Sequence, residues 1–123
     1  MGDDAITIER ANTVFYCATW APTVAFYRST LGLAVTFEND WFVEFSLGEA
    51  ASLSIADAAR ATIDAVAGQG VTITLRVPDV ARVHDVLRSR GVELTEIIER
   101  WGGHVCYCRD PEGHRIEFWS DIR

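Results

Sequence analysis

The side chains best suited to chemistry lie near the C-terminal end of the chain. His104, Cys106 and Cys108 alternate along one stretch, and Glu117 follows in a second stretch. A carboxylate in a dry cavity has a raised pKa, so it can act as a general base or accept a hydrogen bond from a ligand. We therefore take Glu117 as the leading catalytic candidate. As a plain strand residue it would instead pair with Arg115, two positions away on the same face.

The alternating residues His104, Cys106 and Cys108 are not expected to hold one metal ion together. Same-face neighbours on a strand lie about 7 Å apart, which is too far for all three to reach an ion at about 2.0–2.3 Å. A pair such as Cys106 with Glu117 across a hairpin is geometrically easier. We expect His104 to line a pocket or its rim, and Cys106 to belong to the binding surface.

An internal repeat indicates which elements position these side chains. The stretch 17–32 aligns with 77–91, so that Arg28 matches Arg88 and a glycine ends each copy. A repeat of this length is one structural unit that packs against its copy. We expect one domain over 1–123, with a first module at about 11–57, a linker at about 58–70 and a second module at about 71–120. The same offset matches Glu44 to His104, so both are catalytic candidates that could face each other.

Hydrophobic periodicity and turn residues predict the elements of each module. The predicted strands are 12–17, 33–37, 41–47, 52–56, 71–77, 92–98, 104–109 and 114–119. Thr19 and Asp79 are expected to cap the two helices, the second of which spans 79–90, and a short helix is expected in the linker. The sequence Asp110-Pro-Glu-Gly113 is typical of a type I turn. The pattern predicts an α+β fold of paired βαβββ modules.

Side chains alternate between the two faces of a strand, so the predicted strands sort the residues. In the last hairpin the alternation predicts Val105, Tyr107, Ile116 and Phe118 beneath a helix. It places His104, Cys106, Cys108, Arg115, Glu117 and Trp119 on the opposite face. That face mixes polar and aromatic side chains in three strands, which indicates a concave binding surface. Its other expected members are Tyr16, Phe42, Glu44, Thr72, Thr74 and Arg76.

Two motifs resemble the vicinal oxygen chelate superfamily, which includes glyoxalases, bleomycin-resistance proteins and extradiol dioxygenases. They are Ala25-Phe-Tyr-Arg-Ser-Thr-Leu-Gly-Leu33 and Arg109-Asp-Pro-Glu-Gly-His-Arg-Ile-Glu-Phe-Trp119. The resemblance covers nearly the whole chain. It implies that the paired modules form a cup-shaped mixed sheet with helices on the convex face, and that the protein is a homodimer.

The metal-ligand positions of that family, carried onto this chain, hold Asn12, Ser54, Thr72 and Glu117. Amide and hydroxyl oxygens donate too weakly to hold iron, nickel or zinc against water. We therefore predict that the protein needs no metal and no other cofactor, and we place these four residues in the ligand-binding surface. The alternative is a hard ion such as Mg²⁺ or Mn²⁺ on Glu117 with Asn12 and Thr72.

The formal charge of −7 excludes nucleic acid and anionic membranes as expected partners, because both require clustered Lys and Arg. The acidic start lacks the apolar stretch of a signal peptide, and no apolar run approaches the roughly 18 residues of a membrane-spanning helix. We expect a cytoplasmic protein whose three cysteines stay reduced.

Two functional hypotheses follow. The first is a metal-independent protein that sequesters a small organic molecule, cationic or aromatic, as the bleomycin-resistance branch does by binding alone. The second is an enzyme: a lyase, isomerase or hydrolase using Glu117 with His104 or Glu44, or a metal-dependent lyase, isomerase or dioxygenase with atypical oxygen ligands.

Overall fold

The chain folds as two successive βαβββ modules in a computed structural model that describes residues 5–122. The first contains β1 (Ala11–Cys17), α1 (Trp20–Ala25), the π-helix η1 (Phe26–Thr30), β2 (Val35–Glu38), β3 (Phe42–Ser46) and β4 (Ala51–Asp57). The second contains β5 (Thr72–Arg76), α2 (Val80–Ser89), β6 (Ile98–Arg100), β7 (Gly103–Arg109) and β8 (Arg115–Asp121). The predicted α+β class and paired modules are confirmed. The short helix expected in the linker is a single 3₁₀ turn, η2 (Ala58–Arg60).

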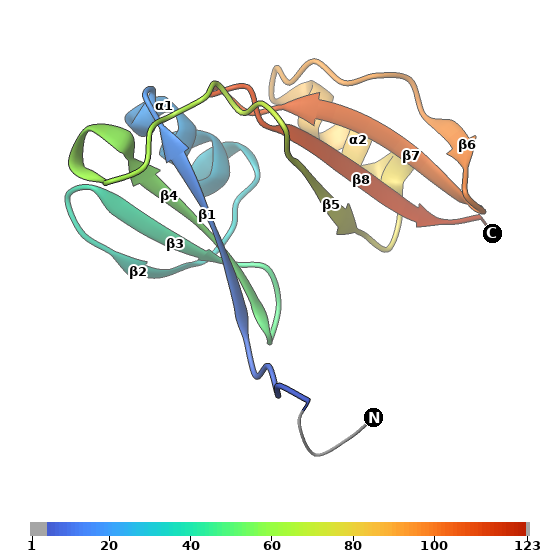
Figure 1. Cartoon of the computed structure of the whole chain (residues 1–123). Coiled ribbons are helices and arrows are strands. Elements are labelled where there is room, and N and C mark those ends of the chain that lie inside the picture. The colour runs from blue at the N-terminus through green and yellow to red at the C-terminus, as the bar shows by residue number, and fades with distance from the viewer. Residues whose placement is uncertain (1–4, 123) are drawn as a thin grey trace.

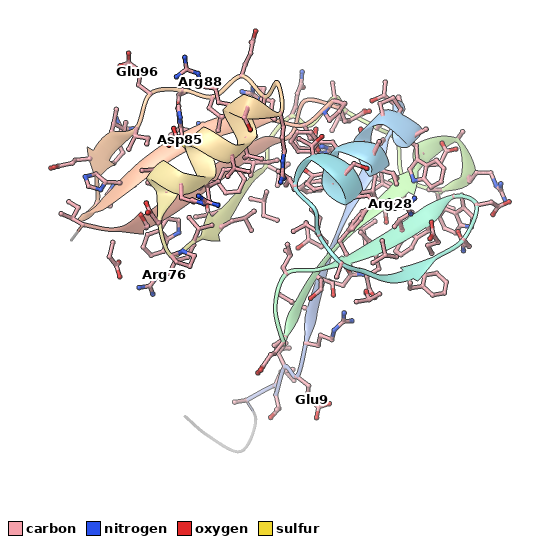
Figure 2. All side chains as sticks on the ribbon, turned by 180° about the vertical axis from the view of Figure 1, so that it is seen from behind. Glu9, Arg28, Arg76, Asp85, Arg88 and Glu96 are labelled. Atoms are coloured by element: carbon pink, nitrogen blue, oxygen red, sulfur yellow. The ribbon has the colours of Figure 1, made fainter. Side chains whose placement is uncertain are left out.

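Each module builds its own mixed four-stranded sheet. The strand orders are β1-β4-β3-β2 and β5-β8-β7-β6, with the first pair of each sheet parallel and the other pairs antiparallel. The sheets approach each other around the linker and spread apart below it (Figure 1). Helices α1 and α2 lie on the same side of the molecule (Figures 1 and 2). The helix-free faces of both sheets therefore turn toward the other side.

The two helix-covered faces share one apolar core. Phe15, Phe45 and Ile55 from the first module belong to the same buried cluster as Ile116 and Phe118 from the second. Burial of this apolar surface stabilises the fold and joins the modules. Among the described residues, no helix is long and apolar enough to cross a membrane.

The two helices begin differently. The Asp79 carboxylate caps α2 as predicted, accepting hydrogen bonds from the backbone N–H groups of Ala81 and Arg82. Thr19 precedes α1, but its side chain does not cap that helix. Its hydroxyl instead donates to the Glu112 carboxylate in the second module. Thr19 thus occupies the predicted N-cap position, but its hydroxyl joins the modules instead of capping the helix.

The predicted strand 92–98 is also wrong, because β6 begins only at Ile98. The Thr95 N–H donates to the Tyr107 carbonyl at 3.0 Å, while the Tyr107 N–H donates to the Thr95 side-chain hydroxyl at 2.9 Å. A side-chain acceptor replaces the backbone carbonyl that a strand ladder requires. Segment 92–97 therefore follows the edge of β7 without forming a strand.

The predicted faces of β7 are inverted. Directly opposite residues of an antiparallel pair share a face, and β7 pairs Tyr107 with Glu117 and Cys106 with Phe118. Val105 and Tyr107 therefore lie on the helix-free face, whereas His104, Cys106 and Cys108 lie on the helix-covered one. The β7–β8 loop pairs Arg109 with Arg115, one residue beyond the start of the predicted strand 114–119. A register change of one residue moves every side chain of a strand to the opposite face.

Candidate functional site

The helix-free face of the first sheet contains a hydrogen-bonded amide–hydroxyl pair. Ser54 on β4 is fully buried, and its hydroxyl donates to Asn12 Oδ1 on β1 at 2.8 Å. Glu44 lies opposite Ser54 on β3, as the alternation predicted. The half-buried rings of Tyr16 and Phe42 come from the same face, on β1 and β3. This face is thus a polar strip with an aromatic end.

Glu44 is tied into that strip. Its carboxylate accepts a hydrogen bond from the Thr36 hydroxyl at 2.7 Å and one from Arg10 at 3.3 Å. The Thr36 hydrogen bond, followed by the hydrogen bond and charge of Arg10, holds the Glu44 pKa below its usual range. Glu44 is therefore ionised at neutral pH and suits a ligand-binding role better than that of a general acid.

The helix-free face of the second sheet is organised around Glu117. This carboxylate is only 9% exposed and lies between Thr74 on β5 and Tyr107 on β7. Burial, followed by the hydrogen bond and charge of Glu117, raises the pKa of Tyr107. The phenol is therefore protonated at neutral pH, and Glu117 lies directly opposite Tyr107 on the neighbouring strand. Alternation placed Thr74 here correctly but missed Tyr107.

Arginines stacked on aromatic rings flank Glu117 on both sides. The Arg115 guanidinium lies 4.8 Å from the centre of the Tyr107 ring, and its Nε donates to the Thr72 hydroxyl at 2.9 Å. The Arg76 guanidinium lies 5.1 Å from the centre of the Trp119 ring. Such stacking fixes both the cation and the ring. The surroundings of Glu117 are therefore richer in positive charge than the acidic chain as a whole, and they offer flat surfaces to a planar ligand.

Two predicted site residues do not reach this face. Cys106 is fully buried on the helix-covered side, and burial raises its pKa to about 11. His104 also lies on that side, with Nε2 3.8 Å from a Glu99 carboxylate oxygen on the neighbouring strand. Glu44 and His104 thus occupy different modules and opposite faces. The expectations that they face each other and that Cys106 lines the cup were wrong, because the register of β7 was misassigned.

The four family ligand positions form two pairs, one in each sheet. Asn12 lies near the start of β1, far along the strand from the linker, whereas Thr72 begins β5 next to the linker (Figure 1). Ser54 is already bonded to Asn12, and Thr72 accepts from a guanidinium. In the described chain no buried side-chain nitrogen or oxygen lacks a partner, and no three His, Cys, Asp or Glu residues gather as a metal site. This donor set does not fit a transition metal.

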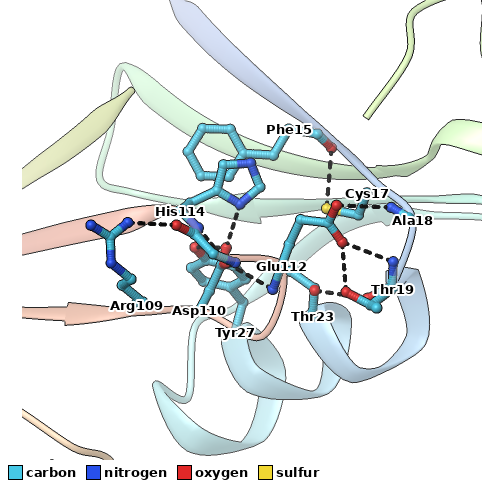
Figure 3. Close-up of polar contacts among 11 residues, drawn as sticks. Phe15, Cys17, Ala18, Thr19, Thr23, Tyr27, Arg109, Asp110, Glu112 and His114 are labelled. Carbon is cyan, nitrogen blue, oxygen red and sulfur yellow. Dashed lines mark hydrogen bonds and ion pairs between the residues drawn. The ribbon is translucent and has the colours of Figure 1, made fainter. Parts of the chain in front are cut away.

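A second polar cluster, at the junction of the modules, was missed at the sequence level. Asp110 in the β7–β8 loop is buried, and its Oδ2 accepts from the Tyr27 hydroxyl at 2.7 Å and contacts His114 Nδ1 at 2.8 Å (Figure 3). Its Oδ1 accepts three backbone N–H groups of its own loop, those of residues 112–114. The His114 ring stacks on Phe15 of β1 at 3.8 Å. The turn motif therefore joins the second module to the first.

Glu112 completes this junction. Its carboxylate accepts the backbone N–H groups of Ala18 and Thr19 and the Thr19 hydroxyl, at 2.5–3.1 Å. Burial alone would raise its pKa, but these hydrogen bonds and the charge of His114 outweigh burial and hold the pKa below its usual range. A lowered carboxylate pKa stabilises the fold above the unfolded-state pKa, and this contribution is lost as the pH falls through the folded-state pKa.

The comparison with protein families matches most of the chain. The family described as Glyoxalase/Bleomycin resistance protein/Dioxygenase superfamily covers residues 11–118. A search among curated proteins finds no match.

Several solved structures share the fold. A glyoxalase/bleomycin resistance protein/dioxygenase from Nocardioides is 20% identical, with a TM-score of 0.78 over 99% of this chain and 87% of that one. An antibiotic-binding protein from a Streptomyces species is 18% identical, with a TM-score of 0.79 over 98% and 100% of the two chains. A lactoylglutathione lyase from Agrobacterium tumefaciens is 23% identical, with a TM-score of 0.71 over 98% and 96%. Binding proteins and enzymes are thus both present among the similar structures.

Proposed function

Because this chain belongs to the Glyoxalase/Bleomycin resistance protein/Dioxygenase superfamily, we propose that it binds a small organic molecule without a metal, as a cytoplasmic homodimer. The observation that carries the proposal is the hydrogen bonding and residue types of the four family metal-ligand positions. Asn12 and Ser54 bond to each other, Thr72 bonds to Arg115, and one carboxylate remains. These groups can orient a ligand through hydrogen bonds but offer a transition metal no imidazole or thiolate.

The ligand lies against the helix-free faces. Glu117 and Tyr107 supply the polar contacts, and the stacked pairs Arg115–Tyr107 and Arg76–Trp119 supply flat walls. Asn12, Tyr16, Phe42, Glu44 and Ser54 form the opposite wall, on the first sheet. A planar, partly polar compound uses both kinds of surface. The similar antibiotic-binding protein from Streptomyces supports binding as the activity.

The open arrangement of one chain supports the homodimer. Its two helix-free faces spread apart from the linker (Figure 1), so the two halves of the site do not close on each other within one chain. A second copy can place its second sheet opposite the first sheet of its partner, in a closed, symmetric pair. Each cup then takes Asn12 and Ser54 from one chain and Thr72 and Glu117 from the other.

A chemical reaction is the second candidate function, favoured by the pairing of Glu117 with the Tyr107 phenol and by the similar lyase. In that case Glu117 acts as a base or proton acceptor toward a ligand held on the same face. A hard ion held by Glu117 with Asn12 and Thr72 is the metal-dependent version of this candidate.

The test is a thermal-shift and calorimetric screen of planar organic compounds, with mass spectrometry of each recovered compound. We expect at least one compound to raise the melting temperature and to be recovered unchanged. Glu117→Gln should weaken its binding about tenfold, because hydrogen bonds to charged groups contribute about 1.5–3 kcal/mol. Glu96→Gln, which removes an equal charge from an exposed position (Figure 2), should leave binding unchanged. A product would favour the enzyme, and an unaffected Glu117→Gln would contradict the proposed site.

Mixed dimers test which chain supplies each wall. We expect Asn12→Ala and Glu117→Ala each to lose binding as homodimers, because each removes a polar contact from every cup. In a mixed dimer of the two variants, a shared cup predicts one intact site and one doubly altered site. Calorimetry should then find one ligand for every two chains. Equal loss of binding in the mixed dimer would show that each cup belongs to a single chain.

A further inference from the structure

A second cavity lies between the two modules and borders the site described above at Tyr107 and Arg115. It has a volume of about 800 Å³, within the range of pockets for drug-sized ligands. Phe26 and Thr30 of the π-helix η1 form one wall, and the segment after α2 forms another. The remaining wall is the end of β7, its loop and the first residue of β8. π-helical turns are rare and occur often at functional sites.

Three guanidinium groups line this cavity, and each bonds to a neutral oxygen. Arg90 donates to the Thr30 carbonyl at 2.7 Å, Arg109 to the Gly113 carbonyl at 2.8 Å, and Arg115 to the Thr72 hydroxyl. Within residues 5–122 the arginines that form carboxylate ion pairs are others, namely Arg10, Arg28, Arg60 and Arg76. A guanidinium carries five N–H donors, so each of the three retains donors for a further acceptor.

Two acidic residues line the same cavity, and they differ in availability. Both Asp110 oxygens are occupied by the hydrogen bonds that close its loop and join it to Tyr27, and the residue is buried. Glu93 is exposed and forms no ion pair within the described residues. Three cations therefore face one accessible carboxylate, in a chain whose net charge is −7. This local reversal of charge favours an anion.

The other lining surface is apolar. Phe26, Leu94 and Pro111 line the cavity together with the arginines, and so does Tyr107, whose ring lies under the Arg115 guanidinium. An apolar wall with a few convergent polar groups is typical of a site for an organic ligand. Arginine suits the recognition of carboxylates because its planar fork can donate two parallel hydrogen bonds.

We propose that this cavity binds an aromatic carboxylate, with the carboxylate held by Arg90 and Arg109 and the ring packed against Phe26 and Leu94. Glu117 and the other family ligand positions do not line this cavity, although Arg115, which does, also bonds to Thr72. Arg115, whose guanidinium lies over Tyr107, borders both surfaces. An anionic compound and the ligand of the helix-free faces can then bind to the same protein.

The test is calorimetric titration of the full-length protein with benzoate, 1-naphthoate and indole-3-acetate, and with 1-naphthalenemethanol as the neutral comparison. We expect at least one carboxylate to bind with one site per chain, and the neutral alcohol to bind at least about tenfold more weakly. Arg90→Gln and Arg109→Gln should each weaken carboxylate binding about tenfold, since each removes charged hydrogen bonds. Arg109→Lys keeps the charge without the fork and should be intermediate.

Two control variants show whether a loss of carboxylate binding is specific to this cavity. Arg60→Gln removes the same charge from the linker, and Glu117→Gln alters the helix-free face; both should bind within about twofold of the unaltered protein. Melting temperatures identify any variant that has lost its fold, and the comparison then uses Arg109→Lys. Failure of all three carboxylates to bind would overturn the proposal. So would equal weakening in Arg60→Gln, or a loss that occurs only in Glu117→Gln.

Discussion

Replacing Asp110 by alanine should lower the free energy of unfolding by about 3–5 kcal/mol, the range typical of removing one member of a buried, hydrogen-bonded charged pair. The substitution removes the acceptor of three loop N–H groups and of the Tyr27 hydroxyl, and the Tyr27 side chain has no solvent exposure. Asp110→Asn keeps one carbonyl oxygen and should lose less. Tyr27→Phe removes a single hydrogen bond and should cost about 1 kcal/mol.

Urea denaturation followed by fluorescence measures these differences. Asp85→Ala is the matched control, because Asp85 is an exposed aspartate on the outer side of α2 (Figure 2). It should change stability by less than about 0.5 kcal/mol. If Asp110→Ala unfolded within about 1 kcal/mol of the unaltered protein, the loop would not join the modules as the hydrogen bonds indicate.

Gly68→Ala should have an effect of similar size for a steric reason. A Cβ atom at this position would lie 2.3 Å from the backbone nitrogen of His114 and 2.4 Å from the carbonyl carbon of Gly113. Backbone atoms cannot move aside as a flexible side chain can. We expect a loss of about 3–5 kcal/mol, from overpacking and from the left-handed backbone conformation that Gly68 adopts and a non-glycine residue rarely does.

Gly70→Ala separates the two causes. Gly70 has a φ of +80°, close to the +73° of Gly68, but no atom lies within 4 Å of its added Cβ. The loss of stability in Gly70→Ala should be limited to the backbone strain of about 1–2 kcal/mol. The difference between the variants, measured by denaturant unfolding, reports how tightly the linker packs on the β7–β8 loop. Equal losses would mean that the linker can move away from the loop without cost.

The sequence predicts the fold because the features that define its helices, strands and turns depend on residues close together in the chain. The Asp79 cap, the glycine that ends each helix and the alternation in β3 all depend on neighbouring residues, and the structure confirms them. The register of β7 was missed because it depends on loop length. The Asp110 N–H bonds to the His114 carbonyl, so the hairpin closes one residue later than a four-residue turn would.

The candidate site could be predicted only in part, since it depends on contacts between distant elements. Alternation placed Glu44, Thr74, Arg76 and Trp119 correctly on the helix-free faces. The wrong register of β7, however, put Cys106 on this face instead of Tyr107. The junction was missed for a related reason. Asp110 and Glu112 appear in the sequence as turn residues, and nothing local shows that their carboxylates bond to Tyr27 and Thr19, more than eighty residues away.

Metal analysis tests the proposed metal-independent binding most directly. The protein is purified without chelator from cells grown with iron, nickel, zinc and manganese, and its metal content is measured together with ligand binding before and after EDTA. We predict far less than one metal ion per chain and the same ligand affinity after EDTA. One ion per chain that EDTA removes together with binding, and that Glu117→Gln fails to retain, would contradict the account.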